Sequence, residues 1–210
     1  MKNKYFSIWL ALICIVLFIL QTVIPGLTDS LILNKSALSG EVWRFLTSIF
    51  LHGSFSHLLL NMFALILFGL ILESLIGSKR FLLVFLVSGV VANIVSVFFY
   101  PASLGASGAI FGILGALTII KPLMGVFVYG LPMPMFVAAI VWILIDLYGV
   151  INPSDVGNIA HISGIVIGFL FGFYFRLRHF KKAMIRADYS RISIPEHEMR
   201  SWEEKWIRPS

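Results

Sequence analysis

Residues Ser56–Ile76 read SHLLLNMFALILFGLILESLI, and this stretch decides the fold class. It is apolar over about 20 residues, the length that an α-helix needs to cross the hydrocarbon core of a bilayer. His57 and Asn61 interrupt it near its start and lie four residues apart, which places them on one face of a helix. Because polar side chains are costly inside hydrocarbon, they indicate a functional site there.

The whole chain has the same apolar character. Hydrophobic residues make up 59% of its 210 residues and charged residues 12%, and its mean hydropathy is +0.96. Repeated apolar runs of this kind predict an all-α membrane protein rather than a soluble domain. One domain over residues 1–178 and a basic tail over residues 179–210 are expected. We predict six spans in the first domain, at Phe6–Ile24, Ser56–Ile76, Phe81–Phe99, Ser107–Ile120, Val126–Tyr148 and Gly157–Phe175.

The basic residues predict the orientation of the spans. Nine of the sixteen lie between Arg176 and Arg208, directly after the last span. The net charge of +6 therefore indicates a topology signal and a contact for anionic lipid rather than nucleic acid. With cytoplasmic termini, fourteen basic residues lie inside, and only Lys35 and Arg44 lie outside. The compact form favours a prokaryotic plasma membrane, with an organellar membrane as the alternative.

This orientation brings four polar side chains to one depth, because the second, fourth and sixth spans all run from outside to inside. His57 and Asn61 lie near the start of the second span. Ser107 starts the fourth span, and His161 lies about one turn into the sixth. A serine, two histidines and an asparagine in the outer half of the membrane indicate the site of a serine hydrolase.

Ser107 is the candidate nucleophile. It lies in the stretch Gly105-Ala106-Ser107-Gly108, whose glycines allow a neighbouring helix to approach closely and leave the Ser107 N–H free to bind an oxyanion. The alternative role of a serine at the start of a helix is that of an N-cap. The sequence is not a G-x-S-x-G nucleophile elbow, because Ala109 stands where that motif has glycine.

His161 is the candidate general base, because a neutral imidazole at the depth of the serine can accept its proton. Gly164 and Gly168 follow on the same side of the helix and predict a tight contact with the small residues of the fourth span. The alternative is that these residues only pack. We expect no acid to orient His161, since Asp155 lies near the membrane surface and Asp146 at the outer end of the fifth span. The prediction is a Ser–His dyad.

His57 and Asn61 are the candidate oxyanion donors, because both side chains donate hydrogen bonds. Their alternative role is to join helices through polar contacts. A zinc site is not expected, because no His-Glu-x-x-His motif occurs and His52 lies five residues from His57.

The long first loop is expected to lie partly in the membrane interface, because it is rich in aromatic and aliphatic residues. Its Trp43-Arg44 pair suits this boundary. We expect the indole at headgroup level and the guanidinium on a phosphate or a carbonyl.

Together these motifs resemble those of the rhomboid family of intramembrane serine proteases, in the family's order and over about residues 5–178. The resemblance implies a six-helix bundle with a partly membrane-embedded first loop. It also implies a lateral gate in the fifth span, whose inner end Pro132 and Pro134 loosen. The matching residues are Trp43, Arg44, His52, Gly53, His57, Asn61, Gly105, Ala106, Ser107, Gly108, Phe111, Ala160, His161, Gly164 and Gly168.

The resemblance further implies a reaction on transmembrane protein substrates. Ser107 would be the nucleophile and His161 the base, with the ring of Phe111 packed against the imidazole. His57, Asn61 and the Ser107 N–H would stabilise the oxyanion, and the other matched residues would support the site. No cofactor, metal ion or nucleic acid is implied. The alternatives are a catalytically silent scaffold, which usually lacks the serine or histidine present here, and a small transporter, whose inverted repeats the sequence does not show.

Overall fold

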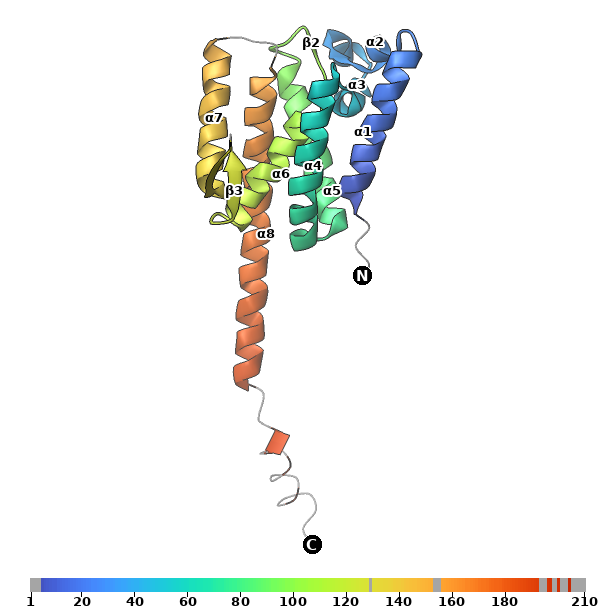
Figure 1. Ribbon diagram of the computed structural model, residues 1–210. Helices are drawn as coiled ribbons and strands as arrows, with labels where there is room; N and C mark the ends of the chain where they lie inside the picture. The colour runs from blue at the N-terminus through green and yellow to red at the C-terminus, as the bar shows by residue number, and fades with distance from the viewer. Residues whose placement is uncertain are drawn as a thin grey trace. The chain divides into compact units, whose positions relative to one another are not determined.

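The computed structural model describes residues 5–128, 130–152, 156–192, 196–197, 200 and 204, and for 179–192 the backbone alone (Figure 1). The chain divides into a unit Met1–Phe173, which holds every predicted site residue, and a unit Tyr174–Ser210. In the second unit the guanidinium of Arg178 lies over the Tyr174 ring, 5.0 Å from its centroid. The lipid contact predicted for the tail falls largely on side chains outside the described residues and stays a prediction.

The chain is a mostly helical membrane protein, as predicted. Among the described residues, four helices are long and apolar enough to cross a bilayer: α1 (Phe6–Val23), α4 (Phe55–Ile76), α5 (Ser78–Ser96) and the segment Asn158–Arg178 of α8 (Asn158–Ile192). Two apolar helices are shorter, α6 (Ser107–Ile120) and α7 (Met135–Ile151). The same described part of the chain forms two small antiparallel pairs, β1 (Leu33–Asn34) with β2 (Ala102–Ser103), and β3 (Gly125–Val128) with β4 (Leu131–Pro134).

The predicted start of the fifth span is wrong. Residues from Val126 onward form the β3–β4 hairpin, and α7 begins only at Met135. Two prolines in β4, Pro132 and Pro134, lack the backbone N–H that a helix interior needs. Gly130 has a φ of 80°, the left-handed conformation that a tight hairpin turn requires. The helix therefore starts directly after the second proline.

Helix α6 lies at the centre of the first unit (Figure 1). Ten of its fourteen residues are buried, whereas the spans α1, α4, α5 and α8 are buried over at most 39% of their apolar windows. The neighbouring helices thus surround α6 and turn their outer faces toward lipid. The fourth predicted span, Ser107–Ile120, agrees with α6 at both ends.

The contact between α6 and α8 is as close as their glycines predict. A methyl group on Gly164 would overlap the carbonyl oxygen of Gly108, and one on Gly168 would overlap that of Gly112. The two backbones therefore touch, which is possible only where neither helix carries a side chain. This contact sets the position of the first turn of α8 relative to the start of α6.

The first loop folds into short helical turns beside α1 (Figure 1). They are α2 (Leu27–Leu31), the 3₁₀ turn η1 (Lys35–Ser39), α3 (Arg44–Thr47) and the 3₁₀ turn η2 (Ser48–Phe50). Arg44 is buried, donates from Nη1 to the carbonyls of Asp29 and Ile32 at 2.7 Å each, and pairs with Glu41. We expected this guanidinium to bind either a phosphate or a carbonyl, and in the structure it binds carbonyls. The neighbouring Trp43 is half-exposed and donates from its indole to the Ser30 carbonyl.

Candidate active site

Ser107 is the first residue of α6, and the N-cap is Ala106, whose side chain makes no capping hydrogen bond. The alternative role of Ser107 as an N-cap is therefore wrong. The first backbone N–H groups of a helix have no acceptor within the helix, and they lie at the positive end of its dipole. The start of α6 thus combines a half-buried hydroxyl with N–H groups suited to a developing negative charge.

Gly105 brings His57 of α4 next to Ser107. Its φ of 124° lies in the range that disfavours any side chain. A Cβ at this position would stand 2.9 Å from His57 Nε2 and 4.0 Å from Ser107 Oγ. The imidazole and the hydroxyl therefore flank the same small space, which only a glycine leaves open.

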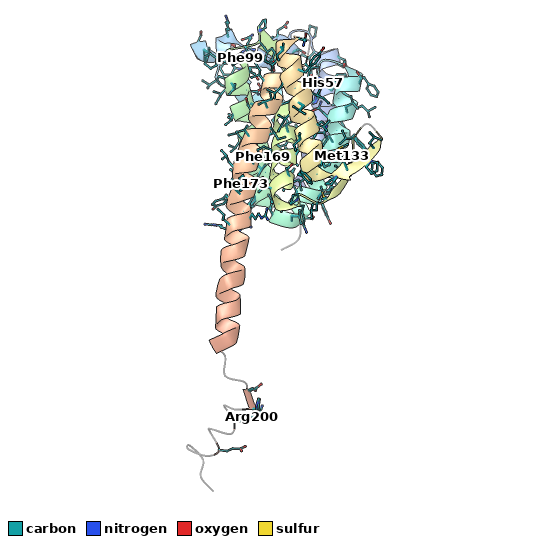
Figure 2. All side chains as sticks on the ribbon, turned by 90° about the vertical axis from the view of Figure 1, so that its left-hand side faces the viewer. His57, Phe99, Met133, Phe169, Phe173 and Arg200 are labelled. Carbon is teal, nitrogen blue, oxygen red and sulfur yellow. The ribbon has the colours of Figure 1, made fainter. Side chains whose placement is uncertain are left out.

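The start of α4 is set by a capping residue directly before it in the sequence. Ser54 is its N-cap, and its hydroxyl accepts the backbone N–H of His57 at 3.2 Å. One turn later, Asn61 is buried, and its amide donates to the His57 carbonyl at 2.8 Å. Asn61 thus lies one turn from His57 on α4, and among the described residues its amide donates only this one hydrogen bond. Figure 2 shows His57 at the same end of the first unit as Phe99.

His161 lies in the first turn of α8, where it contacts both α6 and α7. The ring of Phe111 stacks on the imidazole with centroids 4.1 Å apart and planes 6° from parallel, so the predicted packing of Phe111 is confirmed. Phe111 comes one turn after Ser107 on α6, which puts His161 over the start of that helix. Within the part of the chain that the structure describes, no hydrogen bond joins Ser107 to His161.

The prediction that no acid would be placed to orient His161 is wrong. Asp146 of α7 lies with Oδ1 3.0 Å from His161 Nδ1. The C-terminal part of α7 packs beside the first turn of α8, so a residue near the end of one helix meets a residue at the start of the next. Asp146 is the single charged residue of α7, and a charge within an apolar span is a signal that the sequence does carry. Asp155, the other acid considered, lies outside the described residues.

A comparison with known families matches residues 39–178 to the rhomboid domain, two thirds of the chain and all the residues of this site. The chain belongs to the rhomboid family. Its relatives include RHOMBOID-like protein 1 of Arabidopsis thaliana, 40% identical over 140 residues. Rhomboid protease GluP of Bacillus subtilis is 40% identical over 142 residues, and Rhomboid protease GlpG of Haemophilus influenzae is 32% identical over 137 residues.

These matches cover 63–66% of this rhomboid chain. They cover 69% of GlpG but only 36% of RHOMBOID-like protein 1 and 26% of GluP. The chain therefore spans just over a third of the length of RHOMBOID-like protein 1 and about a quarter of that of GluP. Helix α1 precedes the matched domain.

His52 lies beside the site of the rhomboid domain but outside its helices. Its ring meets that of His57 edge to face, with centroids 5.1 Å apart. The side chain is 1% exposed, and neither ring nitrogen has a hydrogen-bond partner among the described residues. Burial is the main cause that lowers the pKa of His52 to about 4, and the electrostatic effect of the neighbouring His57 lowers it further. His52 is therefore neutral near pH 7 and packs as an aromatic support for His57.

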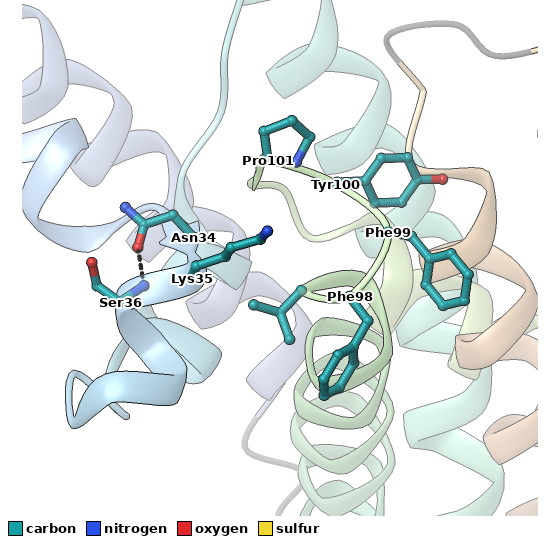
Figure 3. Close-up of a pocket in the computed structure, with 8 residues that line it drawn as sticks. Asn34, Lys35, Ser36, Phe98, Phe99, Tyr100 and Pro101 are labelled. Atoms are coloured by element: carbon teal, nitrogen blue, oxygen red, sulfur yellow. Dashed lines mark hydrogen bonds between the residues drawn. The ribbon is translucent and has the colours of Figure 1, made fainter.

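A separate pocket of about 520 Å³ lies between the first loop and the end of α5 (Figure 3). None of the rhomboid site residues lines it. One wall of the pocket is aromatic, and the other is the polar start of η1. There the side chain of Asn34 accepts a hydrogen bond from the backbone N–H of Ser36. In the described part of the chain, no three histidine, cysteine or acidic side chains gather as metal ligands. The lining residues are Asn34, Lys35, Ser36, Val97, Phe98, Phe99, Tyr100 and Pro101.

Proposed function

We propose that this rhomboid-family chain is an intramembrane serine endopeptidase that cleaves transmembrane segments of other proteins. The observation that carries the proposal is the meeting of three helices at Ser107. His57 of α4 stands across Gly105 from its hydroxyl, and His161 of α8 stacks on the next turn of α6. A hydroxyl, an imidazole base and hydrogen-bond donors are the parts that acyl transfer needs.

The reaction uses Ser107 and His161 as nucleophile and base. Ser107 Oγ attacks the carbonyl carbon of the scissile peptide, and its proton passes to Nε2 of His161. The carbonyl oxygen becomes an oxyanion, which accepts hydrogen bonds from the Ser107 N–H, His57 and Asn61. When the C–N bond breaks, His161 protonates the leaving amine. Water then hydrolyses the ester at Ser107, with His161 again as base.

The arrangement proposed for the membrane has six spans, with α6 and α7 as the two short ones. The first loop lies partly in the outer leaflet, and both termini lie in the cytoplasm. The site residues then lie near the outer surface, where water can reach Ser107 and a substrate helix can unwind. The asymmetry of the basic residues supports this orientation.

Cleavage of a model transmembrane substrate in liposomes tests the proposed function. The parent chain should cut it, and Ser107→Ala and His161→Ala should each lower the rate by on the order of 1000-fold, within the range that a general base contributes. Ser163→Ala is the matched control, because that hydroxyl donates to the Ile159 carbonyl of its own helix. It should cut at the parental rate.

Labelling by a serine-reactive fluorophosphonate separates the possible failures. A parent chain that labels at Ser107 but leaves the substrate intact has a competent site and a different substrate. A parent chain that neither labels nor cuts, while it still binds a transmembrane helix, is a scaffold, and the proposed function is then wrong.

A further inference from the structure

Asp146 is a buried carboxylate that the proposed reaction leaves unexplained. It is the one charged residue of α7, and its side chain is 5% exposed. A carboxylate removed from water costs several kcal/mol unless a partner compensates it. Among the described residues, the partner of Asp146 is His161, which lies fifteen residues later on another helix.

The contact selects one tautomer of His161. An ionised carboxylate can only accept a hydrogen bond, so Nδ1 of the imidazole must carry the proton that is shared with Asp146. In a neutral ring the other nitrogen, Nε2, is then unprotonated. This is the tautomer that can take a proton from Ser107. The opposite tautomer would present an N–H to the serine and could not act as its base.

The contact also completes the orientation of the ring. Phe111 lies parallel to the imidazole at 4.1 Å and restrains the tilt of its plane, but a half-turn about the Cβ–Cγ bond would leave the ring parallel and exchange its two edges. The hydrogen bond from Nδ1 to Asp146 removes this freedom, because it anchors one corner of the ring. Phe111 and Asp146 together therefore determine where Nε2 points.

We propose that Asp146 is a positioning residue for His161, and that the reaction runs with a Ser–His pair held by a third, acidic side chain. The inference rests on the proposed function. No proton moves to Asp146: the proton from Ser107 stays on Nε2 until the amine leaves, and the carboxylate balances the positive imidazolium during that time. A countercharge at this distance interacts strongly with the imidazolium, because the contact between the two side chains is largely shielded from water.

The rival explanation is that the Asp146–His161 pair only ties α7 to α8. The two explanations differ in what a variant changes. A lost structural tie lowers the fraction of molecules with a formed site, but each formed site reacts at the parental rate. A lost positioning contact leaves the sites formed and slows every one of them.

Fluorophosphonate labelling of Asp146→Asn measures both quantities in the purified full chain. We expect labelling to reach the parental extent with a first-order rate constant lower by on the order of 100-fold, the lower end of a general base's contribution. For a cleaved transmembrane substrate, kcat should fall by a similar factor while KM stays the same. Asp146→Glu, which restores a carboxylate, should recover part of the rate constant. Asp29→Asn is the control, because that carboxylate is exposed and far along the chain from the site.

A parental rate constant in Asp146→Asn overturns the inference, whether the extent of labelling is normal or reduced. Equal rate constants for Asp146→Asn and Asp146→Glu, both slow, also overturn it, because the negative charge would then not matter. These outcomes leave the proposed function standing as long as the parent chain labels and cuts. If the parent chain does neither, the proposed function is wrong and the inference falls with it.

Discussion

At the scale of single residues, two positions stand out in the site: Gly105, which has no side chain, and Asp146, which is charged. Gly105 lacks the side chain that would separate His57 from Ser107, and its backbone conformation would strain any other residue. Asp146 carries a charge where the rest of α7 is apolar. Both features are visible as residue types in the sequence. Their partners are not, because each partner belongs to a different helix.

Gly105→Ala should lower the rate constant for labelling of Ser107 by more than about 10-fold. Its new methyl group would stand 2.8 Å from a carbon of the His57 ring, so the ring must move away from the serine. Gly40→Ala is the matched control, with a φ of 115° and nothing within 4 Å of the new methyl group. Both changes cost about 1–2 kcal/mol of backbone strain. If both variants label alike, the position of His57 does not matter to the reaction.

At the scale of secondary-structure elements, α8 is positioned from two sides. Its glycines bring it against α6, and at its start the N–H of Ile159 donates to the Tyr100 hydroxyl from the end of the α5–β2 connection. The first turn of α8, which carries His161, is therefore held at both its backbone and its packed face. Small residues allow this contact in a membrane, where apolar burial alone gives little drive for helix association.

Gly164→Ala tests this contact. Its methyl group would overlap the Gly108 carbonyl, so α8 must shift away from α6 at a cost of about 1–3 kcal/mol. We expect a lower thermal unfolding midpoint in detergent and slower labelling of Ser107. Gly157→Ala is the control, because its methyl group would meet only the Ala160 side chain, at an ordinary 3.7 Å. An unchanged midpoint in Gly164→Ala would contradict the close contact.

At the scale of the whole molecule, α1 is joined to the rhomboid domain although it lies before the matched residues 39–178. The carboxylate of Glu73, near the end of α4, accepts the backbone N–H groups of Phe6 and Ser7 at 2.9 and 3.0 Å. It also accepts the Ser7 hydroxyl at 2.9 Å. Glu73 thus caps the start of α1 from another helix and supplies the negative charge that a helix N-terminus favours.

Glu73→Gln should weaken this joint by about 1–3 kcal/mol, as expected for a hydrogen-bonded buried charge that is removed. We expect a lower unfolding midpoint and a parental rate constant for labelling of Ser107, because Glu73 lies far from the site along α4. Ser74→Ala, whose exposed hydroxyl donates to the Ile71 carbonyl of its own helix, is the control. A midpoint equal to that of the parent would show that α1 is held by apolar packing alone.

The sequence by itself determined the membrane class and the approximate positions of the apolar helices apart from the start of α7, because apolar length is a local property. It also singled out the polar candidates His57, Asn61, Ser107 and His161. It also carried the glycines that predict the contact of α6 with α8. The tertiary structure alone decided that His57 faces Ser107 across Gly105 and that Asp146 meets His161. Both contacts depend on how far each helix is rotated and shifted against its neighbour. The rotation and the shift of a helix result from the packing of whole helices against one another, so no single segment of sequence determines them.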